Sequence, residues 1–187
     1  MLVTVMDAPP TRDETGDPWT TRGGVGVMIR PIAGDDEEGM ARFHRSLSPE
    51  TVYTRYFNVA KLSVRTAPAR LDRVCHPAPD DETVLVVETA TAAASGRRIV
   101  GVGRLSVLPG GGGAAEVAFL VCDSFQRQGL GSELLRRLVE AAGRRGLRHL
   151  RAHLLPGNVA MRALCLRAGM RLAGGLEEQE IRAEIDL

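Results

Sequence analysis

Several features that mark other protein classes are missing from this chain of 187 residues. It has no run of about 18 apolar residues, so no membrane-spanning helix and no membrane partner is predicted. Its N-terminus carries acidic residues and prolines instead of a basic segment followed by an apolar one, so no export signal is expected. The three cysteines are scattered and fit neither a disulfide framework nor a metal spacing, which favours a reducing, cytoplasmic location.

An excess of one charge is lacking as well. The 24 Lys+Arg residues stand against 23 Asp+Glu residues, which leaves a formal net charge of +1. Such a chain has no overall field that would steer it onto a polyanion, so nucleic acid is excluded as an expected partner. Lys61 is the sole lysine among the basic residues, and a GC-rich genome accounts for that bias without a functional reason.

The length fits one domain of ordinary size. Residues 1–24 mix proline, glycine, threonine and charge without a period, and are expected to form a flexible N-terminal tail. Residues 25–187 are expected to form a single folded domain.

Periodicity and turn residues predict the order of elements within that domain. Ser48 and Pro49 look like the cap and first residue of a helix. The expected elements are a strand at 25–30, helices after Asp35 and Ser48, a short helix at 67–76, strands at 83–91, 99–108 and 114–122, a helix from 130, a strand at 147–155, a helix from Asn158, and one or two strands within 170–187. An antiparallel meander followed by a helical crossover to a parallel strand indicates an α+β fold with a mixed sheet.

The stretch Gln126-Arg127-Gln128-Gly129-Leu130-Gly131 joins an apolar strand to an amphipathic helix. At a helix start several main-chain N–H groups lack partners and the helix dipole is positive, so an anion binds favourably there. Gly129 and Gly131 remove side chains that would keep a pyrophosphate from those amides, and Arg127 adds a charge. The stretch therefore indicates a phosphate-binding loop, although an ordinary glycine-rich turn has the same local pattern.

Two common nucleotide motifs do not fit this loop. A Rossmann site has Gly-x-Gly-x-x-Gly near the first strand, whereas Ser132, Glu133 and Leu134 follow the second glycine here. A phosphate-loop NTPase has Gly-Lys-Ser/Thr, which is also absent from this stretch.

The loop instead resembles the acyl-CoA pyrophosphate loop of the GCN5-related N-acetyltransferases (GNAT), Gln/Arg-x-x-Gly-x-Gly/Ala. The later residues Asn158, Met161, Leu164 and Gly169-Met170 resemble a helix motif of the same family. Near the N-terminus, Ile29-Arg30-Pro31-Ile32 and residues 47–57 resemble the start of the bacterial Pat-type protein lysine acetyltransferase domains.

This resemblance implies a GNAT fold, which is a mixed, mostly antiparallel central sheet with splayed parallel strands 4 and 5, flanked by helices. Acetyl-CoA would be the cosubstrate, with no metal, and its pantetheine arm would enter the gap between the splayed strands and pair with main chain there. The residues implied to bind it are Phe119, Leu120, Val121, Gln126, Arg127, Gln128, Gly129, Leu130, Gly131, Ser132, Asn158 and Arg162.

The residues allow two alternatives for some of these roles. Asn158 either contacts pantetheine or only caps its helix. Arg162 either reaches a phosphate or lies on a solvated helix face. Relatives often have Arg or Lys where Gln128 stands, so either Gln128 or the adjacent Arg127 meets the pyrophosphate.

Acetyl transfer to an amine needs a neutral amine, and a lysine amine with a pKa of about 10.4 is almost wholly protonated at neutral pH. Glu116 is the candidate general base, because it is an acidic residue within an apolar strand, where burial would strengthen it as a base. Pat-type domains carry their base in a similar Ala-Glu-x-Ala-Phe setting. The alternatives are a solvent-facing Glu116 at a strand edge and a base at Glu88 on the neighbouring strand.

The remaining chemistry rests mainly on the resemblance. A main-chain N–H near Leu120 or Val121 would stabilise the oxyanion. Many relatives place a tyrosine acid seven residues after the asparagine, where this chain has Cys165, which is either a weak acid or a small core residue. The four histidines show neither a nucleophile pairing nor a ligand pattern, and are expected to be structural.

These observations predict acetyl-CoA-dependent N-acetylation of a protein lysine by direct attack. The Pat-type resemblance implies an AMP-forming acyl-CoA synthetase as the modified protein. Two alternatives stay open: acetylation of a small-molecule amine, and a non-catalytic module that senses acyl-CoA and binds partners.

Overall fold

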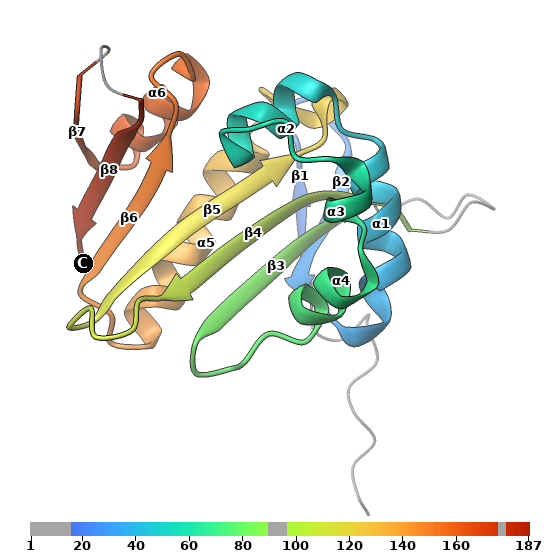
Figure 1. Ribbon diagram of the computed structural model, residues 1–187, viewed down its shortest axis with the longest axis horizontal. Helices are drawn as coiled ribbons and strands as arrows, with labels where there is room; N and C mark the ends of the chain where they lie inside the picture. The colour runs from blue at the N-terminus through green and yellow to red at the C-terminus, as the bar shows by residue number, and fades with distance from the viewer. Residues whose placement is uncertain (1–15, 90–96, 176–178) are drawn as a thin grey trace, which may run out of the picture.

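The computed structural model describes residues 16–89, 97–175 and 179–187. A single sheet of eight strands runs through the molecule in the order β1-β2-β3-β4-β5-β6-β8-β7 (Figure 1). The strands are β1 (Asp17–Thr20), β2 (Gly26–Pro31), β3 (Glu82–Thr89), β4 (Ile99–Val107), β5 (Ala114–Val121), β6 (His149–Leu154), β7 (Arg171–Ala173) and β8 (Ile181–Asp186). Only β5 and β6 pair in parallel among these strands, so the predicted mixed, mostly antiparallel sheet is confirmed.

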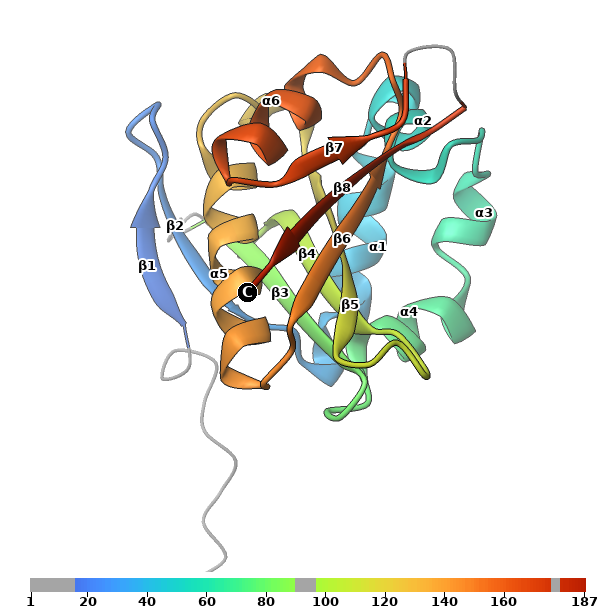
Figure 2. The same cartoon turned by 90° about the vertical axis from the view of Figure 1, so that its left-hand side faces the viewer.

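Helices cover the two faces of the sheet unequally. Helix α5 lies against one face, α1 to α4 gather on the other beside β2 to β4, and α6 lies next to β7 and β8, as Figure 1 and Figure 2 show. The helices are α1 (Glu37–Arg45), α2 (Pro49–Tyr56), α3 (Leu62–Arg65), α4 (Pro68–Cys75), α5 (Leu130–Arg144) and α6 (Val159–Arg167), with 3-10 turns η1 (Gly34–Asp36) and η2 (Asp123–Phe125). The part of β5 and β6 opposite α5 is left uncovered.

Strand β1 lies where the sequence predicted a flexible tail. It pairs antiparallel with β2, so the expected domain start at residue 25 is wrong, while residues 1–15 lie outside the described part. The strand escaped prediction because its four residues show no apolar alternation, and its side chains contact distant segments: Trp19 packs against the core and Asp17 Oδ2 lies 2.6 Å from Arg137 Nη1 on α5. The extra strand also shifts the count, so the predicted splayed strands 4 and 5 are β5 and β6.

Local signals placed most helix starts correctly. Ser48 caps α2, because its hydroxyl oxygen accepts a hydrogen bond of 3.2 Å from the Thr51 N–H, and Pro49 is the first helical residue. Helix α3 was not predicted, since four residues are too few to show a helical period.

Two hydrophobic clusters lie on the two halves of the sheet, and α5 contributes to both. Leu130 and Leu134 belong to the cluster built on β2 to β4 with α1, whereas Leu135 and Leu138 belong to the one built on β5, β6 and β8. Each buried leucine contributes roughly 1.5–3 kcal/mol. One helix thus holds the two halves together even where neighbouring strands separate.

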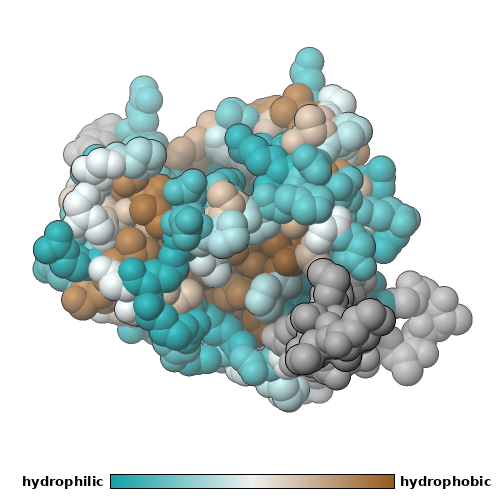
Figure 3. Space-filling model, turned by 90° about the horizontal axis from the view of Figure 1, so that it is seen from below, coloured by the Kyte–Doolittle hydropathy of each residue, from teal (hydrophilic) through white to brown (hydrophobic). Residues whose placement is uncertain are grey.

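The outer surface is mostly polar in the view from below, where apolar side chains emerge in separate areas (Figure 3). Among the described residues, no helix is both long enough and apolar enough to cross a bilayer.

Candidate active site

The parallel strands β5 and β6 pair only at their beginnings. The register joins residues 114–116 to residues 149–151, and beyond Glu116 the two strands diverge. The splay that the GNAT resemblance implied is therefore present. It leaves one edge of β5 without a strand partner over its C-terminal half.

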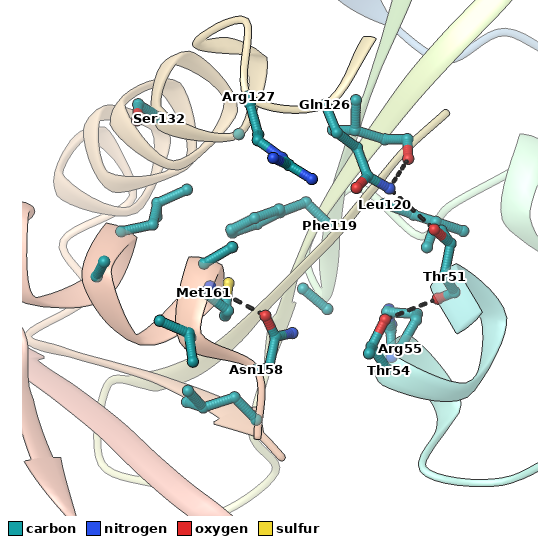
Figure 4. Close-up of a pocket in the computed structure, with 18 of the residues that line it drawn as sticks. Thr51, Thr54, Arg55, Phe119, Leu120, Gln126, Arg127, Ser132, Asn158 and Met161 are labelled. Atoms are coloured by element: carbon teal, nitrogen blue, oxygen red, sulfur yellow. Dashed lines mark hydrogen bonds between the residues drawn. The ribbon is translucent and has the colours of Figure 1, made fainter. Parts of the chain in front are cut away.

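A cavity of about 1090 Å³ opens at this splay. Its wall is formed by β5, the loop that follows it, the start of α5, the end of β6, and helices α2 and α6 (Figure 4). The predicted residues that line it are Glu116, Phe119, Leu120, Val121, Gln126, Arg127, Gly129, Gly131, Ser132 and Asn158. The fold thus brings most of the expected site into one cavity.

The loop between β5 and α5 has the backbone geometry that its glycines suggested. Gly129 has a φ of 93° and is the N-cap of α5, where no side chain caps the free N–H groups of the first turn. A Cβ at Gly129 would lie 3.1 Å from Trp19, and one at Gly131 would lie 2.9 Å from Leu164 Cδ1. Arg127 also has a positive φ, 57°. The helix start therefore presents open main-chain N–H groups to the cavity.

The Gln126 side chain holds this loop instead of facing a ligand. Its Nε2 donates to Thr51 Oγ1 at 2.9 Å and to Val121 O at 3.1 Å, as Figure 4 shows for Thr51. Thr51 Oγ1 in turn donates to Asp123 Oδ1 at 2.8 Å. Burial acts to raise the pKa of Asp123, but hydrogen bonds from Ser48 and Thr51 outweigh it and lower that pKa below its ordinary value. These contacts tie the loop to the start of α2.

Three arginines from different elements border the end of the cavity where α5 begins. Arg127 extends into the space above Phe119 (Figure 4) and makes no hydrogen bond or ion pair with any described residue. Arg22 and Arg167 also line the cavity. Arg22 was missed because it falls within the presumed tail, although its N–H donates to Gln128 O at 2.9 Å.

Three residues expected to bind the cosubstrate do not line the cavity with their side chains. Gln128 Nε2 donates to Ser124 O at 2.8 Å, so Arg127 and not Gln128 faces the anion site. The Leu130 side chain is buried in the core, which leaves only its main chain at the helix start. Arg162 lies outside the cavity wall, and it is half-buried with its Nε shielded from solvent, so its alternative reading as a solvated helix-surface residue does not fit either.

The main-chain N–H and C=O groups of successive residues in β5 point to alternate sides of the strand. The Cys122 N–H donates to Val100 O at 2.9 Å, and in the same register Leu120 pairs with Val102. Even-numbered residues of β5 therefore bond to β4, while odd-numbered ones turn their main-chain groups toward β6. The main-chain groups of Phe119 and Val121 therefore point into the gap. Leu120 forms part of the cavity wall, but its main-chain groups bond to β4 and are not available to a ligand, contrary to the expectation.

Glu116 lies where the two strands separate. Its neighbours Ala115 and Val117 are buried on the α5 side, so the carboxylate is on the opposite face, in the cavity wall. The side chain is 38% exposed, and Oε2 lies 3.9 Å from both Arg151 Nε and His153 Nε2 on β6. The burial expected for this carboxylate is absent, and an arginine and a histidine lie near it instead.

Arg55 on α2 faces the same carboxylate across the cavity. Burial lowers the pKa of the Arg55 guanidinium, while the nearby Tyr56 and Glu116 act in the opposite direction. Arginine keeps its charge under such conditions. Sequence reasoning missed Arg55, because nothing near it in the chain indicates that α2 packs across from β5.

Glu88, the alternative base, is part of a buried ion network. Its two carboxylate oxygens accept from Arg30 at 2.6 and 3.2 Å, and Arg30 is also paired with Asp36 at 2.8 Å. Glu88 does not line the cavity. Its role is to neutralise a buried arginine between β2 and β3, so the fallback assignment is wrong.

Asn158 and Cys165 have structural contacts. Asn158 Oδ1 accepts from the Met161 N–H at 3.0 Å, so it caps α6 while still lining the cavity (Figure 4). Cys165 is fully buried outside the cavity wall, and burial raises the pKa of its thiol to about 11. Cys165 is therefore a core residue and is not placed to act as an acid.

The histidines differ in their surroundings. His44 is buried, and burial lowers its pKa to about 4, with nearby arginines adding to the effect. His76 lies at the surface with Glu37 and Asp72, and one potential ligand atom from each falls within 4.8 Å of the others, a grouping that sequence spacing did not predict. His153 lines the cavity, unlike the other three histidines.

The chain is also similar in sequence to a known protein family. The family model described as an acetyltransferase (GNAT) domain matches residues 27–171. The chain belongs to the GNAT acetyltransferase family. Enzymes of this family use acetyl-CoA, and the present chain is an acyltransferase.

Three relatives are particularly similar. An acetyltransferase of Pseudomonas aeruginosa is 31% identical over 156 residues, covering 82% of this chain and 81% of that protein. The acetyltransferase Pat of Mycolicibacterium smegmatis is 30% identical over 154 residues, which cover 81% of this chain but only 43% of Pat. The crystal structure of the GNAT domain of S. lividans PAT superposes with a TM-score of 0.77 and 28% identity, covering 96% of this chain and all of that domain.

Proposed function

We propose that this GNAT enzyme acetylates the side-chain amine of a lysine in a protein, with Glu116 as the general base. The observation that carries the proposal is that the Glu116 carboxylate shares one cavity with the open edge of β5 and the phosphate-binding loop. The Pat-type resemblance supports the lysine acceptor, and AMP-forming acyl-CoA synthetases as the modified proteins follow from that resemblance alone.

Acetyl-CoA fits this cavity in one direction. Its pyrophosphate would lie on the open N–H groups at the start of α5, between Arg22 and Arg127. Its pantetheine arm would run along the splay and pair with the main chain of Phe119, as an added strand does. The thioester then lies near the point where β5 and β6 separate, close to Glu116.

The chemistry is direct attack of the amine on the thioester carbonyl carbon. Glu116 takes a proton from the lysine ammonium, which is needed because fewer than about one in a thousand such amines is neutral at pH 7. The oxyanion needs a main-chain N–H beside the thioester, and among the odd-numbered residues of β5 that face the gap Phe119 lies nearer to Glu116 than Val121 does. The thiolate leaving group has a pKa of about 8.5 if it resembles free cysteine, so it needs no side-chain acid.

Exposed apolar side chains beside the cavity favour a protein acceptor over a small amine. Val59, 81% exposed, and Leu62, Val64 and Tyr53 lie on or next to α2 and α3, and α2 forms part of the cavity wall. Apolar groups exposed on elements that adjoin a site are typical of protein contact surfaces. A small amine would leave them in water.

A CoA-release assay tests the proposal. Purified enzyme is given acetyl-CoA with either an acyl-CoA synthetase or a panel of small amines, and acetylated lysine is sought by mass spectrometry. We expect labelled synthetase, and loss of turnover in Glu116→Gln. Rapid turnover of a small amine without protein labelling would contradict the lysine assignment, and binding of acetyl-CoA without any turnover would identify a sensor.

A further inference from the structure

His153 on β6 lies between two carboxylates. Its Nδ1 is 3.0 Å from Glu180 Oε1, and its Nε2 is 3.9 Å from Glu116 Oε2. The ring lines the cavity and is only 21% exposed. An imidazole accepts a proton at one nitrogen while it releases one from the other.

The other charged groups that face His153 are cations or lie farther along the sheet. Arg151 is on the same face of β6, Arg182 is its register partner on β8 and is paired with Glu184, and Arg55 approaches from α2. Arginines hold their protons and cannot accept another. Among the described side chains around Glu116, His153 is thus the proton acceptor in reach.

The proposed reaction releases one proton per turnover. The ammonium loses two protons as the N–C bond forms and the C–S bond breaks: one ends on the CoA sulfur, and the other must leave the site. Glu116 is 38% exposed when the cavity is open, but a protein acceptor docked over the opening separates it from water. Glu180 is 48% exposed just before β8 and offers an exit to the side.

We propose that His153 and Glu180 form this exit. His153 Nε2 takes the proton from Glu116, and Nδ1 passes a proton to Glu180, which releases it to solvent. His153 touches no reacting atom and works through Glu116, so it is a positioning residue for proton transfer. The inference rests on the proposed function, because it requires Glu116 to act as a base and a large acceptor to cover it.

The test compares His153→Gln and His153→Ala with His149→Gln. His149 is the matched control, since it lies on the same strand and contacts Asp186 at 2.6 Å but does not line the cavity. We expect His153→Gln to lower kcat about tenfold with a protein acceptor. The KM for acetyl-CoA should not change, and the loss should be smaller with a short lysine peptide. Added imidazole should restore turnover of His153→Ala, and Glu180→Gln should lose activity in the same direction.

The outcomes separate the relay from the function on which it rests. Wild-type kcat in His153→Gln with a protein acceptor would overturn the relay, as would a folded His153→Ala variant that imidazole does not rescue. If Glu116→Gln retains full activity, or if no protein is acetylated, the proposed function is wrong and the relay is wrong with it. If Glu116→Gln is inactive while His153→Gln is unaffected, the relay alone is wrong.

Discussion

The donor half of the site and its acceptor half are built in different ways. The donor half, where acetyl-CoA is expected to bind, comes mainly from residues 119–132, a continuous strand, loop and helix start. The acceptor half joins α2, Glu116 on β5, His153 on β6 and Glu180 beside β8. A local motif contains most residues of the first half, whereas the second exists only after distant segments have packed.

The largest expected effect is in the acceptor half. Glu116→Gln should lower kcat about 100-fold or more at neutral pH, because the amide cannot take the ammonium proton. Steady-state CoA release measures it, and the KM for acetyl-CoA should not change. The loss should shrink as the pH approaches the lysine pKa of about 10.4, where the amine is already neutral. Glu140→Gln, on the exposed side of α5, is the control. An equal loss of kcat in that variant would show that Glu116 does not act as the general base.

The donor half is most sensitive at Gly129. Gly129→Ala places a side chain at a φ of 93°, against Trp19, and should raise the KM for acetyl-CoA about tenfold by distorting the helix start. Gly143→Ala in the same helix meets no atom within 4 Å and should instead stabilise α5 by up to about 1 kcal/mol. Identical KM values in the two variants would contradict the loop assignment.

The two cations at the phosphate end should contribute less. Arg22→Gln and Arg127→Gln should each raise the KM for acetyl-CoA about two- to fivefold at low salt, since exposed charge contacts are weak and screened. S-acetylpantetheine lacks the phosphates and should be used equally well by both variants and the wild type. An equal defect with this shorter donor would show that the arginines act on the fold and not on the phosphates.

Thr51 links the donor half of the site to the acceptor half through hydrogen bonds, so replacing it should lower the stability of the folded protein. Thr51→Val removes the hydroxyl that bonds Gln126 and Asp123, and should lower the free energy of unfolding by about 1–3 kcal/mol. Urea denaturation measures the loss. Thr54→Val is the control, because its hydroxyl bonds only main-chain oxygens of its own helix.

The same cluster predicts a pH dependence. The pKa of Asp123 is lowered in the folded state from a reference value of 3.8, so its stabilising effect is complete above that pH and is lost as the pH falls through the lower folded-state value. The stability difference between wild type and Thr51→Val should therefore narrow under acid. A difference that widens there would contradict the role given to Asp123.

The smallest expected effect concerns Cys165. Cys165→Ala should leave kcat within about twofold of wild type, because the buried thiol has no access to the leaving group. CoA release at neutral pH measures this. A large fall in kcat, in a variant with an unchanged melting temperature, would restore the general-acid role.

The sequence predicted what depends on neighbouring residues. Ser48 and Pro49 mark a helix start, and Gly129 and Gly131 mark an anion-binding turn, because caps and positive φ angles are decided within a few residues. The order of strands and helices likewise predicted the parallel pair, and the GNAT resemblance implied its splay. The helix starts, the positive φ at Gly129 and the splayed parallel pair are confirmed in the fold, whereas anion binding at the turn stays a prediction.

What the sequence did not reveal depends on long-range packing. Gln126 carries the expected motif residue, yet its amide bonds Thr51, which is 75 positions away. Trp19 on β1 and Arg22 in the turn after β1 support the loop, and β1 has no apolar alternation. His153 meets Glu116 only because β6 starts beside β5 and then diverges. No local pattern encodes these contacts, so they emerge only from the tertiary structure.

Titration calorimetry with CoA tests the central claim most directly, namely that the splayed strands and the start of α5 form the CoA site. We expect saturable 1:1 binding that persists in Glu116→Gln and weakens in Gly129→Ala. Absence of binding heat with folded wild-type protein at several temperatures, or affinity unchanged by Gly129→Ala, would contradict this assignment of the site.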